Sequence, residues 1–172
     1  AKFTFAETYK GDFVTRNWET IRSVRKPVIG AVSGFALGGG CELALSCHFR
    51  FMVDSPKAKI GLPEMNIGII PGWGGIHRMT RLLGRSKAMD LIFFSRKLTP
   101  QEALQIGLID KVSAPDELMK DTLDFAQELA SEAEVKEFCE VNFDLSLPMT
   151  TIQNVAKGDV HPFYAWARDV HG

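Results

Sequence analysis

The sequence predicts an α/β fold in which short strands, glycine-rich turns and helices stack as a spiral. The first observation is a repeat: a short apolar run, a glycine turn and a helical segment occur over 28–47 and recur loosely over 59–83. The second is that each repeat carries a glutamate close to glycine, Glu42 in the first and Glu64 in the second. This repetition favours a stacked spiral over a closed barrel.

The bulk composition bounds the class of protein. A chain of 172 residues has the length of one domain with a hydrophobic core. Its hydrophobic share of 45% and charged share of 24% are ordinary for a soluble globular protein. The net charge of −1, together with the lack of a clustered Lys/Arg stripe, argues against a nucleic-acid partner.

The polar and sulfur-containing residues indicate a compartment and exclude a metal centre. No run of about 20 apolar residues occurs, so neither a membrane span nor a membrane partner is expected. The N-terminus shows no signal-peptide pattern. The cysteines Cys41, Cys47 and Cys139 are odd in number and lack metal-ligand spacing, so we expect reduced thiols and a cytoplasmic location. The four histidines form no recognisable ligand set.

The first repeat begins after a polar segment. Residues 8–25 have mostly helical spacing of their apolar positions, and Pro27 ends that helix. Three apolar runs are typical of short strands: 28–32, 35–37 and 49–53. Between the second and third of these runs, residues 41–47 have the composition of a buried helix.

The second repeat starts with a short strand at 59–61 and a helical turn opening at Pro63. Further helices are expected at three places: 76–83 with Gly84 as its C-terminal cap, 86–94, and a segment from Thr99 to Gly107. The last of these begins with a capping threonine, a proline at the first position and Glu102 at the third, which is a clear helix start.

The C-terminal part has a different pattern. Residues 108–112 are typical of a strand, and a helix follows from about 116 to 130. The segment 134–143 has weaker helical spacing, and beyond it we expect irregular chain with a short helix near 164–168. We therefore divide the sequence into a partial spiral core over 1–112 and a C-terminal helical region, partly irregular, over 113–172.

The glycine triplet at 38–40 has two interpretations. A helix N-terminus offers unpaired N–H groups, and glycine lets a ligand oxygen approach them closely, as an oxyanion formed during catalysis would require. Tight packing of a strand against a helix selects glycine equally well. The triplet alone leaves both interpretations open.

The two glutamates are the candidate acid and base. Glu42 lies in a segment with few other polar groups, where burial of a carboxylate is costly without a purpose. Each glutamate alone is also compatible with an ordinary surface position in a first helical turn. Together they are able to divide acid and base roles. Trp73, in the second glycine turn, either lines a ligand pocket or anchors that loop in the core.

Three segments, 26–44, 62–75 and 98–112, closely resemble the signatures of the enoyl-CoA hydratase (crotonase) family. The resemblance implies a crotonase-like spiral of ββα units with C-terminal helices, which binds an acyl-CoA thioester and assembles as a homotrimer or homohexamer. It implies no separate cofactor, since coenzyme A is part of the substrate.

The same resemblance assigns roles to residues. Gly39 corresponds to an oxyanion-hole donor, Glu42 to the glutamate that activates water, and Glu64 to the one that protonates the α-carbon. The substrate-binding positions that it implies are Phe35, Leu37, Gly38, Pro63, Gly72 and Trp73. Having both glutamates favours hydration of a 2-enoyl-CoA. The alternatives are an isomerase-type reaction on the same thioester, and a non-catalytic oligomer or acyl-CoA-binding subunit.

Two departures from the family pattern concern the ends of the sequence. The family carries its second oxyanion donor, and much of its CoA site, in an N-terminal portion that precedes the residues seen here. After Ser131 the sequence reaches 134–143 sooner than family members do, as if a helical segment were missing. We therefore expect the site formed by this chain alone to lack one oxyanion donor.

Overall fold

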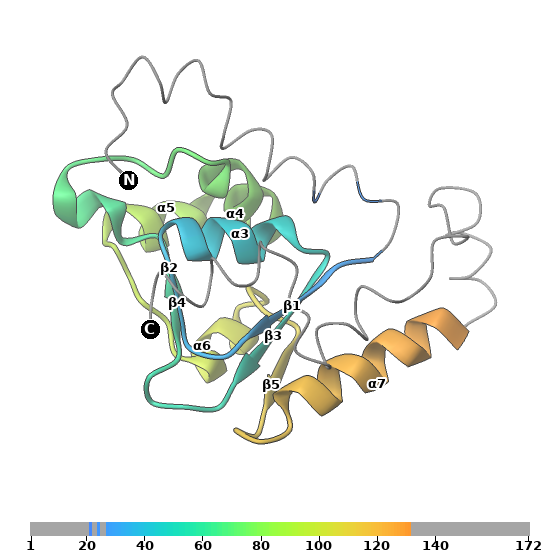
Figure 1. The fold of residues 1–172 in the computed structure, drawn as a ribbon. Helices are drawn as coiled ribbons and strands as arrows, with labels where there is room; N and C mark the ends of the chain where they lie inside the picture. The colour runs from blue at the N-terminus through green and yellow to red at the C-terminus, as the bar shows by residue number, and fades with distance from the viewer. Residues whose placement is uncertain (1–20, 22–23, 25–26, 132–172) are drawn as a thin grey trace, which may run out of the picture.

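The structure is a computed structural model and describes residues 21, 24 and 27–131. Within them the chain alternates strands and helices, which confirms the α/β prediction (Figure 1). The helix expected over 8–25 is described only at single positions, and the segments 134–143 and 164–168 lie outside the described residues.

Five short strands within residues 27–131 form two parallel sheets. The larger sheet has the order β1–β3–β5, with bounds Ile29–Val32, Phe49–Val53 and Lys111–Ser113. The smaller one pairs β2 (Phe35–Leu37) with β4 (Lys59–Gly61). Parallel neighbours need a crossover connection, and the helices between the strands supply it.

The strand register shows why this is a spiral. Ile29 of β1 lies opposite Phe49 of β3, and Phe35 of β2 lies opposite Lys59 of β4. The consecutive strands β1 and β2 therefore pair with the next two strands along the chain, β3 and β4, one turn further on. This stacking confirms the predicted crotonase-like spiral of ββα units.

The helices pack against these sheets and against one another. Their bounds are α3 (Gly39–Ser46), the 3₁₀ helix η1 (Pro63–Ile67), α4 (Gly75–Leu83), α5 (Arg85–Phe93), α6 (Pro100–Gln105) and α7 (Leu118–Ser131). α3 contacts β2 and α4, whereas α7 contacts all three strands of the larger sheet. In Figure 1, α7 (orange) lies along the larger sheet, on the other side of the molecule from α5.

The strand expected at 108–112 is wrong in its bounds. The N–H groups of Leu108 and Ile109 donate to the carbonyl of Ala103, at 2.8 and 3.4 Å, so these residues close the C-terminal end of α6. Both side chains are buried, which explains their apolar character without a strand. The ladder with β3 begins only at Lys111.

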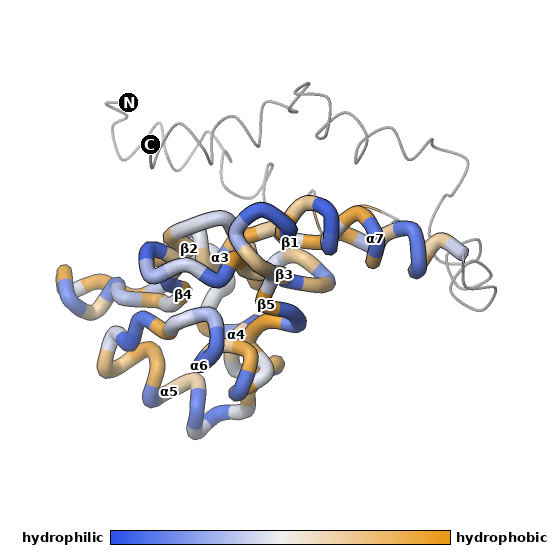
Figure 2. The backbone as a smooth tube through the Cα atoms, turned by 90° about the horizontal axis from the view of Figure 1, so that it is seen from below, coloured by the Kyte–Doolittle hydropathy of each residue, from blue (hydrophilic) through white to orange (hydrophobic). Residues whose placement is uncertain are grey.

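The core lies between the sheets and the helices. Its largest fully buried apolar side chains are Met52, Ile60, Leu62, Met79 and Leu108. Along the tube in Figure 2, apolar and polar stretches alternate within the helices, as expected when one face of each helix covers the sheets.

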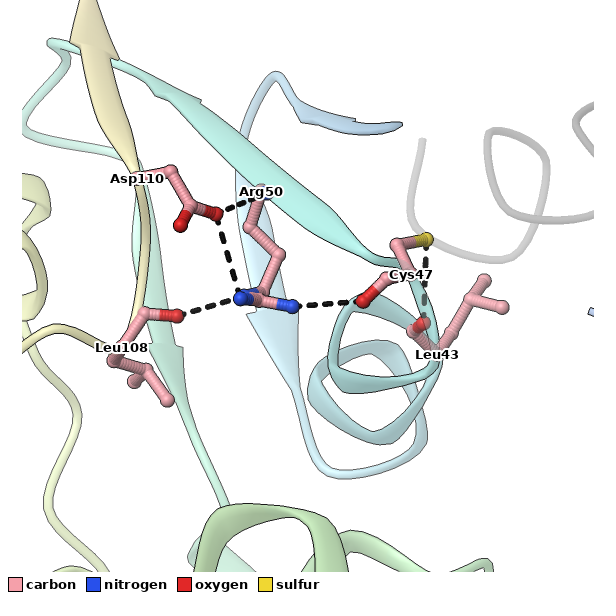
Figure 3. A network of polar contacts seen from close by, with 5 residues as sticks. All are labelled: Leu43, Cys47, Arg50, Leu108 and Asp110. Atoms are coloured by element: carbon pink, nitrogen blue, oxygen red, sulfur yellow. Dashed lines mark hydrogen bonds and ion pairs between the residues drawn. The ribbon is translucent and has the colours of Figure 1, made fainter. Parts of the chain in front are cut away.

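A buried arginine ties the end of α3 to the segment before β5. Arg50, which is 5% exposed, donates to the carbonyls of Leu108 and Cys47 and pairs with Asp110 (Figure 3). Asp110 also accepts from the Arg50 backbone N–H at 2.7 Å. Because a buried charge is costly without partners, these contacts explain why a cation is tolerated there.

Among residues 27–131, none of the helices combines the length and apolar character that crossing a bilayer requires. The same residues contain no cluster of three or more histidine, cysteine or acidic side chains able to hold a metal ion. Cys41 and Cys47 are free thiols, and Cys139 lies outside the described residues.

Candidate active site

Glu42 lies in the first turn of α3 and is almost completely buried, with 2% of its surface exposed. Its Oε1 accepts hydrogen bonds from the backbone N–H groups of Trp73 and Gly75, at 2.8 and 2.9 Å. Gly75 begins α4, so the partial positive charge of that helix N-terminus also faces the carboxylate. The turn that precedes α4 therefore holds Glu42 in a fixed orientation.

The contact between Glu42 and this turn depends on glycine. A Cβ atom on Gly75 would lie 2.7 Å from Cγ of Glu42 and 2.9 Å from its Oε1. Any side chain at this position would push the carboxylate away from the two N–H groups. The second glycine turn of the sequence thus serves the glutamate of the first repeat.

Glu64 lies in the first turn of η1, just after Pro63. Its Oε2 is buried and has no hydrogen-bond partner among the described residues. Burial raises the pKa of Glu64 above its usual value, the backbone N–H of Glu64 itself opposes this, and the charge of Glu42 raises the pKa further. The environment therefore favours the protonated acid more than water does.

The glycine triplet brings Glu64 to the start of α3. Gly38 has φ 56 and ψ −123, in a region that side chains disfavour, and it precedes the helix directly. A Cβ atom on Gly38 would lie 3.1 Å from Oε1 of Glu64. Behind Gly38, the N–H groups of Gly39 and Gly40 begin the helix and have no intrahelical acceptor, as in any first turn. The helix start predicted at Cys41 is wrong, because α3 begins two residues earlier, at Gly39.

The side chain of Cys41 is fully buried next to both glutamates. Burial raises the pKa of its thiol, and the charges of Glu64 and Glu42 raise it further. Such a thiol stays protonated and acts as a small apolar group, not as a nucleophile. Oε1 of Glu64 would lie 3.1 Å from a Cβ atom on Gly38, which directly precedes the helix that carries Cys41 and Glu42. The charge of Glu42 also raises the pKa of Glu64, as expected of two nearby carboxylates.

The implied substrate positions differ in exposure. Phe35 and Trp73 are 57% and 39% exposed, and Gly72 is exposed as well. Leu37 and Pro63 are partly buried. Trp73 donates its backbone N–H to Glu42.

Two features of this site were not predicted from the sequence. The N–H groups of Trp73 and Gly75 bind Glu42, and Arg78 donates from Nη1 to the Trp73 carbonyl at 2.7 Å. Spacing along the chain carries no signal for the first contact, because the partners are 31 and 33 residues apart.

Two surface hollows lie apart from the glutamates. One of about 510 Å³ lies between α5 and α6, and its polar lining includes the ion pair of Asp90 and Arg96. Another of about 310 Å³ lies between the ends of α3 and α4, and is lined by Leu45, His48, Arg50, Arg78, Arg81 and Leu82. Neither lining includes Glu42 or Glu64.

A family model described as enoyl-CoA hydratase/isomerase matches residues 3–166. A probable enoyl-CoA hydratase of Rhizobium meliloti is 49% identical over 127 residues, which cover 74% of this chain and 48% of the relative. A short-chain-enoyl-CoA hydratase of Clostridium acetobutylicum is 46% identical over 125 residues, covering 73% and 46%. The chain thus spans about half the length of the curated relatives it matches.

Solved structures have the same fold. An enoyl-CoA hydratase from Bacillus anthracis superposes with a TM-score of 0.73 at 31% identity, covering 91% of this chain and 61% of that one. The human mitochondrial delta3-delta2-enoyl-CoA isomerase gives a TM-score of 0.65 at 28% identity, covering 73% and 49%.

Proposed function

The chain belongs to the enoyl-CoA hydratase/isomerase family, and we propose that it catalyses the reversible addition of water to a 2-enoyl-CoA thioester. The observation that carries the proposal is the pairing of two differently held glutamates at the start of one helix. Glu42 is fixed by two N–H groups, whereas Glu64 has a raised pKa and a buried oxygen that finds no hydrogen-bond partner within the described part of the chain.

In the proposed reaction Glu42 is the base. The bonds from Trp73 and Gly75 engage its Oε1, which leaves Oε2 to accept a proton from water. The water oxygen then forms a bond to C3 of the enoyl group. The electron pair of the C2–C3 double bond moves toward C2 and the thioester carbonyl, which becomes an enolate-like oxyanion.

The start of α3 is the proposed oxyanion site. The Gly39 N–H points from an uncapped helix N-terminus, where partial positive charge stabilises a developing negative oxygen. Gly38 carries no side chain that would block the thioester from approaching. Water and substrate reach this site from the solvent. We therefore propose that the solvent-exposed side chains of Phe35 and Trp73 contact the acyl group.

Glu64 is the proposed acid. It transfers its proton to C2 of the enolate, which completes the 3-hydroxyacyl-CoA. Glu42 then releases to solvent the proton that it took from water, and Glu64 takes up a proton from solvent, which restores both groups. A carboxylic acid with a raised pKa holds this proton at a higher pH than an exposed one would. The other substrate contacts that we propose are Leu37, Gly38, Pro63 and Gly72. We propose no cofactor beyond the coenzyme A of the substrate.

We also propose assembly into a homotrimer or homohexamer. Several large apolar side chains are exposed on η1, in the residues after it and at the C-terminal end of α5, including Ile67, Ile70 and Phe94 at 74%, 67% and 71%. η1 and α5 contact each other, so these side chains lie on neighbouring elements. Apolar surface of this kind is typical of an interface. The free thiols of Cys41 and Cys47 support a reducing, cytoplasmic location.

Mass spectrometry of the product tests the reaction class. Incubated with crotonyl-CoA, the purified chain should yield a product heavier by one water. A product of unchanged mass formed from a 3-enoyl-CoA would indicate an isomerase. Binding of the thioester without turnover would support a non-catalytic acyl-CoA-binding subunit and contradict the proposal.

A further inference from the structure

We propose that Arg78 on α4 is a positioning residue for Glu42, which it holds through the turn formed by Trp73, Gly74 and Gly75. The inference rests on the proposed function, because it assigns to Arg78 the orientation of the proposed base. Among residues 27–131, no hydrogen bond or ion pair joins the Arg78 side chain directly to Glu42, and in this proposal Arg78 does not contact the substrate.

Two hydrogen bonds link Arg78 to Glu42 through Trp73. Nη1 of Arg78 donates to the carbonyl oxygen of Trp73 at 2.7 Å. The N–H of the same Trp73 donates to Oε1 of Glu42 at 2.8 Å. One residue of the turn is therefore held on its carbonyl side by the cation and on its amide side by the carboxylate.

Arg78 also contacts Gly74, the middle residue of the turn. A Cβ atom on Gly74 would lie 2.5 Å from Nη1 and 3.1 Å from Cζ of Arg78, so the guanidinium packs directly on the Gly74 backbone. The backbone N–H of Arg78 also donates to the Gly74 carbonyl at 3.0 Å. Arg78 thus binds the turn by its side chain and by its main chain.

The contacts of residue 78 with the turn depend on the chemistry of its side chain. A hydrogen bond from a charged donor is stronger than one between neutral groups, and a planar guanidinium packs flat on a peptide where an ammonium does not. Lysine would restore the charge and a donor but not the contact of the larger guanidinium group with Gly74. Methionine has a similar length and supplies neither. The two substitutions therefore separate packing from hydrogen bonding.

The kinetic test compares Arg78→Met and Arg78→Lys with Arg81→Met as the matched control. Arg81 is an exposed arginine on the same helix, one turn further on. With crotonyl-CoA, Arg78→Met should lower kcat about ten- to a hundredfold, the scale of a lost charged hydrogen bond, with KM changed less than about twofold. Arg78→Lys should recover part of kcat, and Arg81→Met should match the wild type.

Amide hydrogen exchange without substrate provides a readout that does not need catalysis. In Arg78→Met, the amides of Trp73 and Gly75 should exchange about tenfold faster, while those of Ala44 and Leu45 in α3 stay protected as in the wild type. Unchanged exchange at Trp73 and Gly75 would overturn the proposal, whether or not the wild type hydrates the substrate. Faster exchange with an unchanged kcat in an active wild type would overturn it too. Inactivity of the wild type with faster exchange at the turn would count against the hydratase proposal alone.

Discussion

At the residue scale, Glu64 links the proposed chemistry to stability. Its raised pKa means that the folded state holds the proton more tightly than the unfolded chain does. Below the usual glutamate pKa of about 4.3 Glu64 is protonated in both the folded and the unfolded state, so its ionisation does not lower the free energy of unfolding. As the pH rises, the unfolded chain ionises first, so the folded state loses stability until its own pKa is passed.

The substitution Glu64→Gln should therefore raise Tm at pH 7 relative to the wild type, with a smaller difference at pH 4. Glu102→Gln is the matched control, because hydrogen bonds from Thr99 lower the pKa of Glu102, and its replacement should reduce stability at pH 7. Thermal unfolding at both pH values measures the two differences. A lower Tm for Glu64→Gln than for the wild type at pH 7 would contradict the inference that burial of this carboxylate destabilises the folded state.

Ser95 is a strained residue outside the proposed site. It ends α5 with φ 51, and its buried hydroxyl has no hydrogen-bond partner among the described residues. The turn is closed by bonds from Ser95 N–H to Ile92 and from Arg96 N–H to Leu91, at 3.2 and 3.0 Å. A non-glycine residue in this left-handed conformation costs about 1–2 kcal/mol.

We expect Ser95→Gly to stabilise the protein by about 1 kcal/mol, because it removes the backbone strain and the unpaired buried hydroxyl. Glycine also makes the unfolded chain more flexible, and this entropy offsets part of the gain. Urea unfolding measures the change. Ser86→Gly, at an exposed position in the same helix, should instead destabilise by about 0.5–1 kcal/mol. Equal effects of the two substitutions would contradict the strain at Ser95.

At the element scale, α6 shows how far local sequence determines structure. The start predicted at Thr99 is confirmed as a complete capping box: Glu102 N–H donates to Thr99 Oγ1 at 3.2 Å, and Thr99 N–H donates to Glu102 Oε2 at 2.7 Å. The helix has only six residues, so its ends matter more than its interior.

Thr99→Ala should destabilise the protein by about 1 kcal/mol, since it leaves the Glu102 N–H without its cap. Chemical denaturation measures this loss, and Gln105→Ala, an exposed position in the same helix, serves as the control with a change below about 0.5 kcal/mol. The capping account fails if Thr99→Ala is no more destabilising than Gln105→Ala.

Elements with local signals were predictable, and those set by distant contacts were less so. The strand runs at β1 to β4 and the caps of α4 and α6 follow from residue types that act within a few positions. The bounds of β5 did not follow, because Leu108 and Ile109 are apolar for burial and their N–H groups serve α6. The early start of α3 was missed because glycine has a low intrinsic helix propensity.

At the scale of the whole molecule, the spiral itself creates the site. Stacking the second repeat on the first brings Gly75 against Glu42, and Glu64 against Gly38. Neither contact can be derived from spacing. The residues alone suggested that the two glutamates, each next to a glycine turn, form an acid–base pair, and the family resemblance added which of them would be the base and which the acid.

The whole-molecule claim is that Glu42 and Glu64 act as a pair on one substrate. Residues that act as a unit lose activity together, so their combined replacement costs little more than either single replacement. Glu102→Gln again provides a matched control, because Glu102 is an exposed glutamate on α6 outside the proposed site.

The most direct test is the rate of crotonyl-CoA hydration by the wild type, Glu42→Gln, Glu64→Gln, the double variant and Glu102→Gln. We predict that each single replacement at the site lowers kcat at least about a hundredfold, the usual effect of losing a general acid or base. The double variant should lose less than about tenfold more, and Glu102→Gln should match the wild type. Near-normal turnover with either site replacement, or no hydration by the wild type, would contradict the account.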